Sequence, residues 1–269
     1  MSTPSQTFAA DLAARRAPKA GGFNLTALRL EIRRLLRNRR TLIITMIFPV
    51  FFFLIFGLNA AYATTPVPGG HGNYAAFIMI SLALYGAVFA ATSGGAMVSI
   101  ERAQGWSRQL RLTPLSPLAY ILMKVLTAMV LGAGSVAAVY IVGDVTNKAS
   151  MPAYLWVVTG LSVWVGSLLF AAFGLFMGYL VPTENVMQLM SLALTLLSFA
   201  GGLFIPVSQY PHAIQEIAKW TPLYGLNQLV HTPLLGNGVD WTWVVNVLFW
   251  LVAFVGGAVW RMRKDTARV

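Results

Sequence analysis

The 269-residue chain contains no cysteine, and only 10% of its residues are charged. Without cysteine, disulfides, zinc–thiolate sites and iron–sulfur clusters are excluded. Charge is missing altogether from residues 41–100, sixty positions without Lys, Arg, Asp or Glu. A soluble fold needs a charged face, whereas a charge at the centre of a bilayer costs about 2.5–3.5 kcal/mol on insertion scales. This run predicts two membrane-spanning helices and a turn, since one span takes about 20 mostly apolar residues.

Signatures of catalysis are also missing from the sequence. It has no G-x-x-x-x-G-K-[ST] phosphate loop, so the chain is not expected to hydrolyse nucleotide itself. It has no G-x-S-x-G motif, and His71, His212 and His231 lack metal-ligand spacing. We predict that the three histidines are solvated loop residues. We therefore expect no catalytic residue, no metal site and no enzymatic activity in this chain.

Ionisable residues are predicted to avoid the middle of the membrane. Lys124 and Glu184 are expected near cytoplasmic helix ends, and Asp144 near an outer end. Transporters driven by proton or sodium gradients commonly place a carboxylate or a histidine in the membrane core. If the chain belongs to an energised transporter, its energy is therefore expected to come from another subunit.

The apolar runs predict an all-α integral membrane protein with six transmembrane helices, at about 41–62, 74–99, 117–143, 153–180, 185–205 and 241–260. Six crossings leave both termini on one side. That side receives all the Lys and Arg residues except Lys148 and Lys219. The positive-inside rule then predicts cytoplasmic N and C termini. The net charge of +11 is accounted for by topology and anionic headgroups, and nucleic acid is not expected as a partner.

The segments around the spans have distinct expectations. Residues 1–22 are polar and lack the apolar core of a signal peptide, which predicts a disordered cytoplasmic tail. Residues 23–40 have leucines on one helical face and arginines on the other, as in an amphipathic interfacial helix. The transmembrane domain covers 41–261, and 262–269 form a cytoplasmic tail. Within the domain, residues 204–240 are apolar but interrupted by Pro and Gly, which predicts an extracellular re-entrant helical hairpin before the last span.

Small residues recur at four-residue spacing in two predicted spans: Gly86, Ala90 and Gly94 in the second, and Gly174 and Gly178 in the fourth. This spacing lets helices approach closely in lipid, and packing within the chain is favoured over a subunit interface. Pro49 is expected to bend the first span, which is tolerated where a neighbour satisfies the freed carbonyl.

The cytoplasmic loop at 100–116 carries the strongest motif. It reads E-R-A-Q-G-W-S-R-Q-L-R-L-T-P-L-S from Glu101 onward and is followed by Pro117 and Lys124. Its first part is compatible with a helix, Pro114 stops that helix, and Ser116 with Pro117 restarts one. The alternative to a loop that contacts a cytoplasmic partner is a loop that only anchors the chain in the lipid headgroups.

This loop resembles that of ABC type-2 exporter permeases, which include the antibiotic-resistance permeases of actinobacteria. Residues 201–206 (G-G-L-F-I-P) and 218–224 (A-K-W-T-P-L-Y) are similar to the family's segment between its last two spans. Trp106 departs from the family's usual small or hydroxylic residue. The resemblance covers about residues 23–265.

The resemblance implies two permease subunits, alike or related, and two ATP-binding subunits on separate chains. ATP and Mg would then be held by the partner, with no cofactor on this chain. The loop would be a coupling helix that contacts the ATPase, with these coupling residues: Glu101, Arg102, Gly105, Trp106, Arg108, Leu110 and Arg111.

The expected function is ATP-driven efflux of amphipathic drug-like molecules or lipids, outward across a bacterial plasma membrane. Asn59, Tyr85, Gln188 and Thr195 are candidate lining residues of the substrate path, although buried polar residues can equally bridge helices. A polysaccharide or glycolipid exporter remains an alternative with the same architecture. A non-transporting membrane scaffold and a lipid-modifying membrane enzyme are further alternatives.

Overall fold

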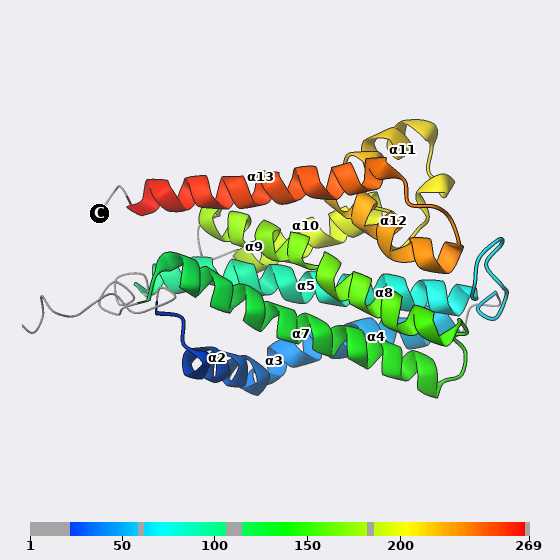
Figure 1. Cartoon of the computed structure of the whole chain (residues 1–269), viewed down its shortest axis with the longest axis horizontal. Helices are drawn as coiled ribbons and strands as arrows, with labels where there is room; N and C mark the ends of the chain where they lie inside the picture. The colour runs from blue at the N-terminus through cyan, green and yellow to red at the C-terminus, as the bar shows by residue number, and fades with distance from the viewer. Residues whose placement is uncertain (1–21, 59–61, 106–114, 182–185, 267–269) are drawn as a thin grey trace, which may run out of the picture.

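The computed structural model describes residues 22–58, 62–105, 115–181 and 186–266, and helices dominate these ranges (Figure 1). The N-terminal part comprises α2 (Leu25–Arg37), α3 (Arg39–Leu42), the π-helical stretch η2 (Ile43–Ile47), α4 (Phe48–Phe52) and a second π-helical stretch, η3 (Phe53–Gly57). The remaining elements are α5 (Tyr74–Ala103), α7 (Pro117–Val145), α8 (Ala153–Gly166), α9 (Leu168–Leu180), α10 (Val186–Ala200), the 3-10 turn η5 (Val207–Gln209), α11 (His212–Lys219), α12 (Pro222–Leu235) and α13 (Trp241–Thr266).

Four helices in the described ranges are long and apolar enough to cross a membrane: Tyr74–Ala103, Leu118–Val145, Ala153–Leu180 and Trp241–Met262. The all-helical membrane protein expected from the sequence is thereby confirmed, and these helices match the second, third, fourth and sixth predicted spans. The first and fifth correspond to shorter apolar helices, Ile43–Gly57 and Val186–Ala200, so a six-span topology stays a prediction.

Helix α5 forms the centre of the bundle, packed mainly between α7 and α9. Small residues make these contacts possible. A side chain on Gly95 would meet the backbone of Leu175 at 2.5 Å, and one on Gly178 would lie 3.0 Å from the Gly95 carbonyl oxygen. Gly94 faces the methyl group of Ala128 on α7. The prediction that these small residues serve packing within the chain is confirmed.

The first apolar helix contains a proline whose structural consequence is visible. Pro49 has no N–H group, so the carbonyl of Thr45, four residues earlier, loses its helical partner. The Ser135 hydroxyl on α7 donates to this carbonyl at 2.7 Å, and both Thr45 and Ser135 are fully buried. Gly86 on α5 leaves the space that Pro49 and Ser135 occupy. The expectation that a neighbour satisfies the freed carbonyl is thus confirmed.

The segment before the last helix forms two short helices, α11 and α12, of very different character. On α11, Ile214 and Ile217 are exposed, as is Trp220 just after it. Helix α12 is largely buried, and it packs against α13, α8 and α5. The two short helices expected in this segment are present, while their arrangement as a re-entrant hairpin in the membrane stays a prediction.

His231 on α12 corrects the expectation of a solvated loop histidine. It is 1% exposed, its ring lies 4.2 Å from the ring centroid of Phe77, and its Nε2 atom lies 3.1 Å from the Ser81 hydroxyl on α5. Its Nδ1 atom lies 2.8 Å from the Asn227 carbonyl oxygen. The prediction failed because the apolar character of α12 was taken for an interfacial segment, whereas tertiary packing buries that helix against α5.

Among the described residues, Lys148 and Lys219 lie at one end of the bundle and the other Lys and Arg residues at the opposite end, as expected from the sequence (Figure 1). Figure 1 shows α2, the C-terminal ends of α5, α9 and α13, and the start of α7 at one end, called the α2 end below. The loop between α7 and α8, which contains Lys148, and helix α11, which ends at Lys219, lie at the opposite end. Assignment of the α2 end to the cytoplasm stays a prediction.

Candidate functional site

The C-terminal end of α5 is the start of the predicted coupling loop. The helix continues to Ala103, a turn further than expected, so Glu101 and Arg102 lie in its last turn. Gly105 then adopts a left-handed conformation, with φ of +75°, and its amide donates to the Arg102 carbonyl at 3.0 Å. This is the common way to end a helix, because glycine adopts that conformation without steric penalty.

Four of the seven predicted coupling residues, Trp106, Arg108, Leu110 and Arg111, lie outside the described residues. The chain is described again from Leu115, and Ser116 then begins α7. Its side-chain oxygen accepts a hydrogen bond from the Ala119 amide at 3.2 Å. The predicted restart of a helix after the loop is thus confirmed by an N-cap.

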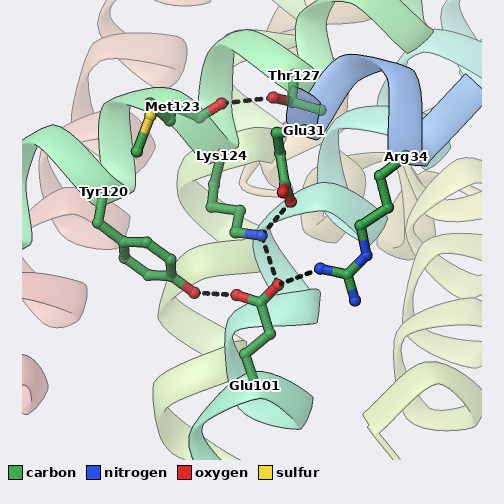
Figure 2. Close-up of polar contacts among 7 residues, drawn as sticks. All are labelled: Glu31, Arg34, Glu101, Tyr120, Met123, Lys124 and Thr127. Atoms are coloured by element: carbon green, nitrogen blue, oxygen red, sulfur yellow. Dashed lines mark hydrogen bonds and ion pairs between the residues drawn. The ribbon is translucent and has the colours of Figure 1, made fainter. Parts of the chain in front are cut away.

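Glu101 points into the protein, where it meets α7 (Figure 2). One carboxylate oxygen accepts from the Lys124 ammonium at 2.5 Å, and the other accepts from the Tyr120 hydroxyl. The Glu101 and Lys124 side chains are 6% and 9% exposed. The Glu101 carboxylate therefore connects α5 to α7 in this structure.

Helix α2 joins this cluster through Glu31 and Arg34 (Figure 2). The Glu31 carboxylate forms an ion pair with Lys124, and Arg34 lies 3.9 Å from the Glu101 carboxylate. Glu31 is partly buried because it occupies the same face as Leu28, Ile32 and Leu35, which packs toward α7. One lysine thus contacts carboxylates from two different helices.

Arg102 turns the other way and contacts the end of α9. Its guanidinium lies 3.4 Å from the Gly178 carbonyl oxygen and 5.0 Å from the centroid of the Tyr179 ring. Nearby, the Ser99 hydroxyl donates to the Val181 carbonyl at 3.0 Å. A cation beside the last carbonyls of a helix also interacts favourably with the helix dipole. Arg102 was predicted as a coupling residue, and the structure places its guanidinium against the end of α9, a contact that the sequence did not indicate.

Taken together, the last turn of α5 is fastened to three helices by polar contacts. Buried ion pairs recover their desolvation cost only with close geometry, and loss of one partner typically costs about 3–5 kcal/mol. Glu31 was missed by sequence reasoning. The signal that could have found it is its position inside the apolar face of α2, where a lone acid requires a cationic partner.

Three of the four candidate path residues, Tyr85, Gln188 and Thr195, lie on α5 and α10. Tyr85 is nearly buried, lies within hydrogen-bonding reach of Thr195, and has its ring 5.3 Å from that of Phe204. Gln188 is exposed on the outer face of α10, and Asn59 lies outside the described residues. The structure therefore brings Tyr85 and Thr195 together and leaves Gln188 two turns away.

A family model described as "ABC-2 type transporter" matches residues 24–232. This match covers well over half of the chain, from the residue that caps α2 to the buried part of α12. The chain belongs to the ABC-2 type transporter family. The protein is therefore a multi-pass membrane permease subunit of a transporter.

A curated relative supports the same assignment. The permease is 26% identical over 239 residues to "Putative transport permease YvfS" of Bacillus subtilis (strain 168), an alignment that covers 88% of this chain and 96% of the relative. The resemblance seen in the loop and in residues 201–224 is confirmed at the level of the family. The family match includes every member of the Glu31, Glu101 and Lys124 cluster in this permease.

Proposed function

We propose that this permease is the membrane subunit of an ATP-driven exporter in a bacterial plasma membrane. Two permease subunits, either two copies of this chain or this chain with a related one, form the membrane part. Two copies of a separate ATP-binding subunit hydrolyse ATP with Mg. The cargo is an amphipathic drug-like molecule or a lipid, moved outward.

The observation that carries the coupling part of this proposal is the way α5 ends. Glu101 ties the last turn to α7, and Arg102 and Ser99 tie it to α9. A displacement of the segment after Gly105 is therefore transmitted to several helices at once. This favours residues 106–114 as the segment that receives force from a cytoplasmic ATP-binding subunit.

The surface of α10 supports a path between two permeases. Gln188, Ser191 and Thr195 recur at helical spacing, and the face that they share is exposed or half-buried in the single chain. Polar side chains that face lipid are unfavourable, whereas they are tolerated along a path that contains water or polar cargo. Tyr85, within reach of Thr195, offers an aromatic ring and a hydroxyl to an amphipathic molecule.

The partner can be tested by purification of the tagged permease from its native membrane in mild detergent, followed by mass spectrometry. We expect a stoichiometric ATP-binding protein. The double variant Arg108→Glu with Arg111→Glu should lose it, because both charges lie in the proposed contact segment. The matched control, Lys148→Glu with Lys219→Glu, reverses two charges at the opposite end and should retain it. Equal retention by both variants, or no ATP-binding protein with the wild type, contradicts the proposal.

The path can be tested with Gln188→Leu in the reconstituted complex. A panel of amphipathic cationic dyes is screened for stimulation of ATP hydrolysis. We expect the order of the dyes to change, because the variant removes a polar group from the α10 face. Leu248→Ala, on the exposed face of α13, serves as control and should keep the wild-type order. An unchanged order in Gln188→Leu argues against this placement of the path.

A further inference from the structure

Helix α2 contacts the rest of the permease through a half-buried apolar face and through an ion pair with Lys124 of α7. Helix α2 has no fully buried residue, and three of its leucines, Leu25, Leu30 and Leu36, are exposed. Its half-buried face rests on α7 through Leu28, Ile32 and Leu35. Apolar packing of this extent gives limited discrimination between positions of α2 along α7.

The polar contacts of α2 with α5 and α7 single out Glu31. The Arg34–Glu101 pair is long, at 3.9 Å, and the Arg34 side chain is 65% exposed, so solvent screens it. The Glu31–Lys124 pair involves a lysine whose side chain is 9% exposed and whose ammonium also pairs with Glu101. The contact with Glu101 of α5 therefore fixes the position of the Lys124 ammonium independently of α2.

We propose that Lys124 is a positioning residue that holds α2 in register with the end of α5. Both helices then move together when residues 106–114, the proposed coupling segment, are displaced. Lys124 belongs to α7, directly between the two carboxylates that it joins. Apolar side chains of similar volume could stabilise this contact equally well, but a charged pair specifies one register. This inference rests on the proposed function, since it assigns a role within energy transfer.

The charges predict that removal of Lys124 and removal of the Glu31 charge have different effects. Loss of Lys124 leaves Glu31 and Glu101 facing each other without their shared ammonium, which is strongly destabilising. Loss of the Glu31 charge leaves the Glu101–Lys124 pair intact, so the bundle keeps its neutral pair while α2 loses its specific contact. Glu31→Gln is therefore the variant that separates register from folding.

The test uses the permease with its co-purified ATP-binding subunit in lipid nanodiscs. Because the chain has no cysteine, spin labels can be placed at Leu30→Cys on α2 and Leu118→Cys on α7, two exposed positions. Double electron–electron resonance then reports the distribution of distances between the helices, and ATP hydrolysis of the same sample is measured. Glu216→Gln serves as matched control, because Glu216 forms an exposed pair with Lys219 at 2.6 Å on α11.

We expect Glu31→Gln to retain the ATP-binding subunit, to broaden the distance distribution, and to reduce stimulation of ATP hydrolysis by about fivefold or more, the lower range of coupling between sites. Lys124→Arg alone, which keeps the charge between both carboxylates, should keep a narrow distribution, and Glu216→Gln should match the wild type. A narrow distribution and full stimulation in Glu31→Gln overturn this inference alone. Failure of the wild type to bind any ATP-binding subunit overturns the proposed function, and the inference with it.

Discussion

Helices α5 and α13 have the same mean hydropathy in their most apolar stretches, 2.0, yet their surroundings are opposite. In α5, 78% of that stretch is buried inside the protein, whereas in α13 the figure is 11%. Helix α5 contains Gly86, Gly94 and Gly95 where it meets its neighbours. Exposed positions of α13 carry bulky side chains such as Phe249 and Val252. Hydropathy identifies a span, and side-chain size indicates whether protein or lipid surrounds it.

The aromatic residues of α13 fit a helix that packs on α9 and α12 with one face and turns the other toward lipid. Trp241 and Trp260 are both exposed, near the two ends of the apolar stretch. At 1.5 Å per residue their separation is about 28 Å, close to the thickness of a hydrocarbon core. Tryptophan is enriched at both membrane–water interfaces, so these residues are expected to mark the two boundaries.

The largest effect that would test this comparison is expected from Gly95→Val. The added Cβ would lie 2.5 Å from the backbone of Leu175, and backbone cannot yield as a flexible side chain does. We expect a loss of stability of about 3 kcal/mol or more, at the upper end of overpacking costs, measured by thermal unfolding in detergent. Gly256→Val on α13 has open space and should be close to neutral. Equal melting temperatures for the two variants would contradict the burial contrast.

A smaller effect is expected at the hydrogen bond that joins the first apolar helix to α7. Ser135→Ala removes the hydroxyl that satisfies the buried Thr45 carbonyl. Loss of one partner from a buried pair costs about 1–3 kcal/mol, so unfolding should begin at a lower temperature or denaturant concentration. Val252→Ala on the exposed face of α13 removes more side-chain volume but should cost less. A neutral Ser135→Ala would mean that the Thr45 carbonyl has another partner.

The smallest effect on stability is expected at the two turns that flank α5. Gly105 and Gly69 both have positive φ angles, +75° and +71°, and neither has an atom in the way of a side chain. Alanine should cost about 1–2 kcal/mol at either position through backbone strain. Only Gly105→Ala should reduce stimulation of ATP hydrolysis, since only Gly105 leads into the proposed coupling segment, residues 106–114. If Gly69→Ala reduces it equally, the effect is not specific to coupling.

Much of the fold could be predicted from patterns along the chain. The spans follow from runs without charge, and the close packing of α5 with α9 follows from the spacing of Gly174 and Gly178. The consequence of Pro49 was predicted as well, because a missing N–H group always leaves a carbonyl without its helical partner. These features depend on neighbours in sequence, or on properties that any close partner would satisfy.

The candidate site was predicted only in part. Glu101 and Arg102 were predicted as coupling residues, and this role stays a prediction, whereas their contacts with α7 and α9 were not foreseen. Glu31 was overlooked, and His231 was wrongly assigned to solvent. In each case the partner is far away in sequence: Lys124 follows Glu31 by 93 positions, and Ser81 precedes His231 by 150. A local pattern can show that a buried polar residue needs a partner, but it cannot identify that partner.

The sequence by itself therefore determined that this is a helical membrane protein, where most of its long helices lie, and which family it belongs to. The helices could be placed because the cost of charge in lipid and the conformational needs of proline and glycine act residue by residue. The family followed instead from the resemblance of the loop after Glu101 and of residues 201–224 to its motifs. Only the tertiary structure decided that α5 is enclosed while α13 is exposed, and that one lysine joins two carboxylates from distant helices. The burial of each helix depends on which helix surfaces pack together. A buried charge is tolerated only where that packing brings an oppositely charged partner to it.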